Sequence, residues 1–263
     1  MNPYLPIRKV PLDYNGISSS AYAVQMQKED PTAGNGWKEV GVVGHSYMLL
    51  PNEDVKNAAH QVAEECKIDF VHDKTFFNGR NFVYSMKSQH VAGEIQVGDD
   101  VALGMQFWNS YDGSKAFGFA MMLYRLICTN GMMSRDHFNT YRFKHEPKSE
   151  DWSDNLEQVV TNINNLVSGT YKLDDLIENL RKLSNMEVTM DVLGDIRHNH
   201  LQEIPVSIWG QIVDRFTHTS KEDYSGWNLL NAGTDLLWHK ENPTITTYGQ
   251  NAAIVDGLCR AVA

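Results

Sequence analysis

A polar turn between two apolar runs is the feature that most constrains the fold of this 263-residue chain. The runs are Val101 to Trp108 and Ala116 to Cys128, and the turn between them, Asn109 to Lys115, contains Asn, Asp, Gly and Ser. Turn residues of this kind between apolar runs predict a hairpin or another tight connection. Arg125 lies inside the second run, so its side chain is either paired in the core or turned toward an anion.

The residues before this turn predict further strands and one helix. Strands are expected at Phe70 to Phe77 and Phe82 to His90. Asn78-Gly79 is a strong hairpin signal, and Gly98-Asp99 marks the next reversal. Upstream, Pro51 is placed to begin an amphipathic helix that extends to about Lys67, with acidic residues in its first turn. The middle of the chain is therefore expected to be an antiparallel meander with a preceding helix.

After residue 151 the apolar positions repeat at intervals of three and four, which is the period of an amphipathic helix. The helices expected there are Asp154 to Val167, Leu173 to Leu183, Ser207 to Phe216, Trp227 to Trp238 and Gln250 to Val262. The predicted fold class is therefore α+β: an antiparallel β-meander with a preceding helix, followed by a mainly helical C-terminal region. Three parts are expected: an irregular N-terminal arm at 1–36 with one short strand around Ala21 to Met26, an α+β core at 37–150, and a helical region at 151–263 packed on that core.

Composition and motifs narrow the class of protein. No apolar run reaches the length of a membrane span, and the N-terminus lacks a secretion signal, so we expect a soluble, cytoplasmic protein. Three scattered cysteines (Cys66, Cys128 and Cys259) predict neither a disulfide framework nor a zinc knuckle. Phosphate-loop, nucleophile-elbow and dinucleotide motifs are missing, so an enzyme is the less favoured interpretation and no cofactor is predicted.

One cluster keeps a metal-dependent enzyme as an alternative. It consists of Asp191, Asp195, His198 and His200. Asp195 and His198 could share one helical face, and His198 and His200 could hold a metal ion if the chain were extended there. No glutamate lies next to a ligand histidine, so solvated side chains are the simpler interpretation.

Charge is distributed unevenly along the chain. The net charge is −10, but residues 1–145 carry 14 Lys and Arg against 15 Asp and Glu, and residues 146–263 carry 9 against 18. Between Gly113 and His145 there are five basic residues and one acidic residue. Because salt limits electrostatic fields to about 8–10 Å, a local basic patch on an acidic protein can still bind phosphate. A merely solvated surface is the equally weighted alternative.

Aromatic and basic residues are interleaved on the predicted strands. Outward aromatic rings beside Lys and Arg form a platform that stacks bases and holds phosphates, which suits single-stranded nucleic acid. The alternative is that the rings are core residues and the cations protect sheet edges from aggregation. The candidates for phosphate contacts are Lys115, Arg125, Arg135, Arg142 and Lys144, and those for base stacking are Tyr111, Phe117 and Tyr141.

Four segments resemble the motifs of a known family. NSYDGSKAF (Asn109 to Phe117), followed by YRLICTNGM (Tyr124 to Met132), is similar to the core of a family of phage- and plasmid-borne proteins known only as a domain of unknown function. VGHSYMLLPNEDV (Val43 to Val55) and GWNLLNAGTDLLWHK (Gly226 to Lys240) resemble its opening and closing motifs. The resemblance covers Trp37 to Lys240 and departs at Asn-Gly-Met (Asn130 to Met132), where the family usually continues Asn-Thr-Leu.

The order of a helix, a meander and a following helix also resembles the single-strand annealing proteins of phage recombination. This resemblance implies a non-enzymatic protein that binds and anneals single-stranded DNA in the host cytoplasm. It also implies a ring or other large homo-oligomer, in which the arm 1–36 contacts a neighbour, and a phage exonuclease or a host protein as a further partner. The alternative is a phage interaction protein that binds a host protein through its acidic helical half.

Overall fold

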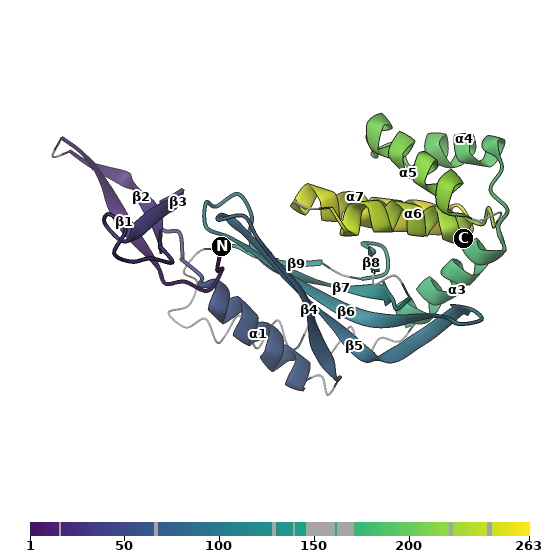
Figure 1. Ribbon diagram of the computed structural model, residues 1–263, viewed down its shortest axis with the longest axis horizontal. Helices are drawn as coiled ribbons and strands as arrows, with labels where there is room; N and C mark the ends of the chain where they lie inside the picture. Colours follow the sequence, from purple (N-terminus) through teal and green to yellow (C-terminus); the bar gives the residue numbers. More distant parts are fainter. Residues whose placement is uncertain are drawn as a thin grey trace. The chain divides into compact units, whose positions relative to one another are not determined.

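The main sheet is an antiparallel meander, and it confirms the predicted α+β class. The computed structural model describes residues 1–15, 17–65, 68–127, 130–138, 140–145, 161, 171–220, 223–240 and 244–263. Its strands, drawn in Figure 1, are β4 (Phe70–Phe77), β5 (Asn81–Gln96), β6 (Asp99–Ser110), β7 (Phe117–Arg125) and β8 (Asn130–Met133), adjacent in that order, with β9 (Thr140–Phe143) paired to β7. Gly79 and Gly98 adopt positive φ angles of 92° and 78° at the two predicted reversals.

The chain divides into two compact units. Unit 1 comprises Met1–Met86, Gln106–Phe119 and Thr140–Asn165, and unit 2 comprises Lys87–Met105, Ala120–Asn139 and Leu166–Ala263. Strands β5, β6 and β7 contribute residues to both units. Each candidate site below is therefore assigned to the unit that contains all of its residues.

Residues 1–36 form most of a second sheet, which corrects the prediction of an irregular arm with one short strand. Strands β1 (Ile7–Tyr14), β2 (Ile17–Gln27) and β3 (Trp37–Gly44) are antiparallel and lie in that order. Pro11 is tolerated because β1 is an edge strand of this sheet, and the pairing register shifts beside it, between Pro11 and Asp13. Asn15, with φ 51°, lies at the reversal between β1 and β2. The turn residues of this segment therefore lie between paired strands and do not indicate an irregular arm.

The core of unit 1 joins this second sheet to the hairpin turn after β6. Val24, Met26, Val40 and Val43 pack in one cluster with Tyr111. Gly41 allows the approach, since a Cβ atom there would lie 2.3 Å from the carbonyl oxygen of Tyr111.

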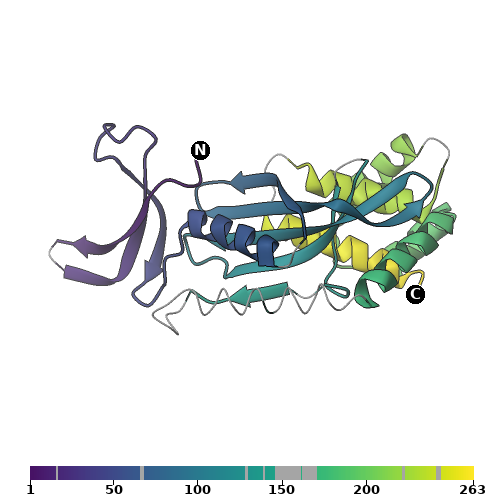
Figure 2. The same cartoon turned by 90° about the horizontal axis from the view of Figure 1, so that it is seen from below.

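Helix α1 (Asn52–Glu65) follows Pro51 as predicted. It buries Val55, Ala59 and Val62, and in Figure 2 it runs in roughly the same direction as the strands drawn behind it.

Unit 2 consists mainly of helices, with one of them, Gly226–Trp238, at its centre. The helices are α3 (Tyr171–Asn185), α4 (Met190–Asn199), α5 (Val206–Thr219), α6 (Gly226–Trp238) and α7 (Ile245–Arg260). Helix α6 contacts α3, α5, α7 and β8. Four of these helices match predicted ones, α4 was not predicted as a helix, and the predicted helix at 154–167 lies outside the described residues. None of the described helices is long and apolar enough to cross a membrane.

Strand β8 explains the departure from the family motif at residue 131. A Cβ atom on Gly131 would lie 2.6 Å from Cζ3 of Trp238, a fully buried side chain of α6. Asn251 of α7 fixes the same strand: its Nδ2 donates to the Gly131 carbonyl at 2.9 Å, and its Oδ1 accepts from the Met133 N–H at 2.9 Å. A side chain at residue 131 would therefore clash with the indole ring.

Candidate functional site

The eight candidate DNA-binding residues belong to two different units. Unit 2 contains Arg125 and Arg135, and unit 1 contains Tyr111, Lys115, Phe117, Tyr141, Arg142 and Lys144. The basic segment that was predicted as one surface therefore contributes to both units.

Tyr111 and Phe117 are core residues, which corrects their assignment as base-stacking residues. Each is 1% exposed. The hydroxyl of Tyr111 accepts a hydrogen bond from the backbone N–H of Asn52 at 3.0 Å, and burial raises its pKa. The ring of Phe117 lies 5.8 Å from that of Phe143. Both rings fill the interior of unit 1 and present no surface to a base.

Arg125 is ion-paired in the core of unit 2, which is the first of its two predicted alternatives. Its Nε lies 2.8 Å from Oδ1 of Asp99, and its Nη2 lies 2.6 Å from Oδ2. The same carboxylate accepts a hydrogen bond from Nε1 of Trp227 at 2.8 Å. The side chains of Arg125 and Asp99 are only 13% and 3% exposed. The guanidinium of Arg125 thus balances the charge of the buried Asp99 carboxylate.

Arg135 is also held by carboxylates of unit 2. Its Nη2 lies 3.0 Å from Glu203, and its Nε lies 3.6 Å from Asp256. Asp256 is buried and accepts further hydrogen bonds from the Ser134 hydroxyl and the Arg135 backbone N–H. Burial raises the pKa of Asp256. A phosphate at Arg135 would have to displace acidic neighbours.

The remaining candidates all belong to unit 1 and are here named the basic edge: Lys115, Tyr141, Arg142 and Lys144. Arg142 and Lys144 are exposed. Tyr141, which lies between the exposed residues Thr140 and Arg142 of β9, is half-buried. The ring of Tyr141 stacks on Phe119 of β7 at 4.8 Å. Among the strands that the structure describes, β9 pairs only with β7. The basic edge therefore combines exposed cations with one partly accessible ring.

Buried hydrogen bonds fix both ends of the basic edge. At Lys115, the Ser110 hydroxyl donates to the carbonyl at 2.8 Å and accepts from the N–H at 3.1 Å. The hydroxyl of Tyr47 donates to the Ser110 carbonyl at 2.6 Å, and burial raises the pKa of Tyr47 to about 12. At the other end, His145 stacks on Tyr47 at 4.5 Å, and its Nδ1 donates to the carbonyl of Met48 at 3.0 Å. Burial lowers the pKa of His145.

One cation–aromatic pair of unit 1 was not expected from the sequence. The guanidinium carbon of Arg8 lies 4.0 Å from the ring centroid of Trp37, and its Nε and Nη2 donate to Oε1 of Gln25. These residues come from β1, β2 and β3. The alternation of Arg8 with its neighbours could have indicated this pair, but the prediction of an irregular arm removed β1 from consideration.

Unit 2 contains a polar cavity of about 520 Å³ where the motif residues of β7, β8 and α6 meet. Its charged and amide lining residues are Arg125, Asn130, Arg215, Asp223, Asn228, Asn231 and Asp235. Nε2 of His239 lies 3.0 Å from Oδ1 of Asn130, and Arg215 pairs with Asp235. Among the described atoms, Oδ1 of buried Asn231 has no hydrogen-bond partner. The cavity offers mostly neutral polar groups, because its two arginines are paired with carboxylates.

The four candidate metal ligands do not form a site. Asp191, Asp195 and His198 lie on α4, and His200 caps its C-terminus. Within the part of the chain that the structure describes, no three His, Cys, Asp or Glu residues are grouped to hold a metal ion. Cys259 is buried, and burial raises the pKa of its thiol to about 12, which disfavours the reactive thiolate.

The fold is α+β, with a hydrogen-bonded hairpin turn in unit 1 and a polar cavity in unit 2. Residues 39–255 match the family model described as Domain of unknown function (DUF932), and the chain belongs to this family. No curated protein and no solved structure matches it.

Proposed function

We propose that this chain binds single-stranded DNA along the basic edge of unit 1. The observation that carries the proposal is the end of β9, where exposed Arg142 and, directly after the strand, exposed Lys144 flank the half-buried ring of Phe143 and follow Tyr141. Arg142 and Lys144 are two residues apart, which is about 6–7 Å in an extended chain, so both cations can contact one phosphate backbone. Lys115 precedes β7, the strand that pairs with β9, and adds a third cation.

Base stacking supplies the second part of the proposed interaction. The ring of Tyr141 rests on Phe119, which holds its plane in place before a base arrives. A preorganised ring loses little conformational freedom on binding, and stacking accepts any base. Trp37, stacked under Arg8 in the same unit, offers another ring of this kind.

The proposed role extends to annealing in a phage- or plasmid-borne recombination system, with the protein acting as a homo-oligomer. Annealing requires that a strand be held by its backbone while its base edges stay accessible for pairing. The basic edge suits that requirement, because its cations contact phosphates and its ring stacks on the face of a base. The hydrogen-bonding edges of the bases then stay free to pair. No nucleophile, metal or cofactor is needed for this step.

The direct experiment is an anisotropy titration of the full chain with a labelled oligo(dT) at about 50 mM and about 200 mM salt. We expect binding at the lower salt and much weaker binding at the higher salt, because phosphate contacts release counterions. A chain that does not bind at the lower salt contradicts the proposal and favours the interaction protein that uses the acidic helical half.

A further inference from the structure

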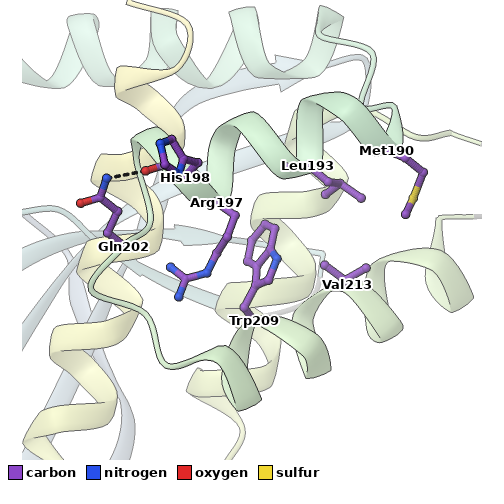
Figure 3. Close-up of a pocket in the computed structure, with 8 residues that line it drawn as sticks. Met190, Leu193, Arg197, His198, Gln202, Trp209 and Val213 are labelled. Carbon is purple, nitrogen blue, oxygen red and sulfur yellow. Dashed lines mark hydrogen bonds between the residues drawn. The ribbon is translucent and has the colours of Figure 1, made fainter.

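A groove of about 600 Å³ lies between α4 and α5 of unit 2. Figure 3 shows Met190 and Leu193 of α4 facing Trp209 and Val213 of α5, with the side chain of Arg197 beside the indole ring. Met190 is 77% exposed, which is unusual for a large apolar side chain next to other apolar groups. The groove is therefore partly apolar and open to a partner.

Charge is arranged along α4 with opposite signs at its two ends. Asp191 lies in its first turn and Asp195 just past its midpoint, and Arg197 and His198 lie in its last turn. The residues lining the groove include Arg197 and His198 but no acidic residue. An occupant that fits this groove brings carboxylates to its basic end.

We propose that the occupant is a second copy of this chain, with the two α4 helices packed antiparallel about a two-fold axis near Gly194. Helical periodicity places Met190, Asp191, Gly194, Arg197 and His198 on one face of α4. In an antiparallel pair centred on Gly194, Asp191 lies opposite Arg197 of the partner subunit, and Arg197 lies opposite the partner's Asp191. The contact is self-complementary, as a two-fold interface must be.

Gly194 is compatible with a close approach of a second helix. A Cβ atom built on it meets no atom within 4 Å, so the fold of its own chain does not require glycine there. Glycine in a helix interior is less favourable than alanine. At the midpoint of the proposed pair, the missing side chain leaves room for the backbone of the partner's α4 to approach.

The size of α4 sets the expected strength. A ten-residue helix is about 15 Å long, so the buried area lies at the low end for specific interfaces, below about 1,200 Å². The dimer should therefore be reversible, with dissociation in the micromolar range. A two-fold contact closes on itself and produces dimers, so it is independent of the proposed DNA binding and of any ring.

The test is sedimentation equilibrium of the full chain between about 1 and about 200 micromolar. Two charge variants decide the geometry: Asp191→Arg and Arg197→Asp. Each variant alone should stay monomeric, because like charges then face each other, and an equimolar mixture should regain the dimer. Because the guanidinium of Arg197 also donates to the carbonyl of Leu201, the fold of the Arg197→Asp variant is checked before its oligomeric state is read.

A matched pair of glycine variants tests the contact without changing charge. Gly194→Phe fills the groove and should give a monomer. Gly210→Phe on α5 should dimerise as the unmodified chain does, since Gly210 also faces open space but does not line the groove. Far-ultraviolet circular dichroism confirms that each variant is folded. The proposal is overturned by an unmodified chain that is monomeric at about 200 micromolar, by a dimeric Gly194→Phe variant, or by charge variants whose mixture stays monomeric.

Discussion

The guanidinium of Arg125 and the indole N–H of Trp227 bind the same carboxylate, Asp99. Asp99 and Arg125 belong to the ends of β6 and β7, and Trp227 belongs to the first turn of α6. Removing one partner of a buried ion pair leaves an uncompensated charge. This carboxylate therefore couples α6 to the strands of unit 2.

Arg125→Met should lower the free energy of unfolding by about 3–5 kcal/mol, because Asp99 is then buried without its counter-charge. Adding Asp99→Asn should recover part of the loss, since the amide carries no charge and can still accept from Trp227. Urea denaturation of the single and double variants measures both effects. A single variant that loses less than about 1 kcal/mol contradicts the assignment of a buried pair.

Gly131→Thr, which restores the residue usual in the family motif, should destabilise this chain by about 1–3 kcal/mol. The cause is the Trp238 ring, which lies within 3 Å of the position of the new Cβ atom. In a Trp238→Leu background the same substitution should cost much less, so a double-mutant cycle isolates the contact. Equal costs in both backgrounds would show that the indole is not responsible.

These two sites show which parts of the fold could be predicted. The turns at Gly79 and Gly98 and helix α1 depend on neighbouring residues, so their sequence signals were sufficient. The partnership of Asp99 with Trp227 spans 128 positions and has no local signal. Pro11 suggested irregular chain, although an edge strand accepts proline without losing a ladder bond.

The burial of two candidate DNA-binding residues could not be predicted, for a related reason. Period-two alternation indicates which residues share a face, but it does not say whether the second face is covered. All residues of β7 from Phe117 to Tyr124 are buried, so both faces of this strand are covered. The rings predicted to face outward from the hairpin, Tyr111 and Phe117, are therefore core residues, whereas Tyr141 on β9 stays partly accessible.

Acidification should destabilise the protein through His145. Burial holds its folded-state pKa below the unfolded value of about 6.5. Above that value both states are neutral and His145 has no effect on stability. As the pH falls below it, the unfolded state takes up a proton that the folded state refuses, so stability falls by at most about 1.4 kcal/mol per pH unit until the folded pKa is reached.

The measurement for His145 is the free energy of unfolding at about pH 7 and about pH 5.5, for the unmodified chain and for His145→Phe. Phenylalanine keeps the stacking on Tyr47 and cannot titrate, so the decrease on acidification should be smaller in the variant. Asp256 acts in the opposite direction, because its raised pKa favours the folded state on protonation, and it is unchanged in both proteins. An identical decrease in both proteins would exclude His145 as the cause.

Tyr141→Ala should weaken binding of oligo(dT) by about 1–3 kcal/mol, the usual contribution of one stacked base. Tyr141→Phe keeps the ring on Phe119 and should bind nearly as well as the unmodified chain. Thermal melting of both variants separates a loss of stacking from a loss of folding. Equal affinities of the alanine and phenylalanine variants, with both folded, would remove Tyr141 from the proposed interface.

The most direct test of the central claim compares two triple alanine variants by their salt dependence of oligo(dT) binding. One variant changes Lys115, Arg142 and Lys144 of the basic edge, and the control changes Arg135, Lys182 and Arg260, which are half-exposed and ion-paired in unit 2. Both lose three positive charges. The log–log slope should shrink by about two in the first variant, at about 0.7 per lost phosphate contact, and stay unchanged in the control. An unchanged slope in the first variant, or equal shrinkage in both, would contradict DNA binding at the basic edge.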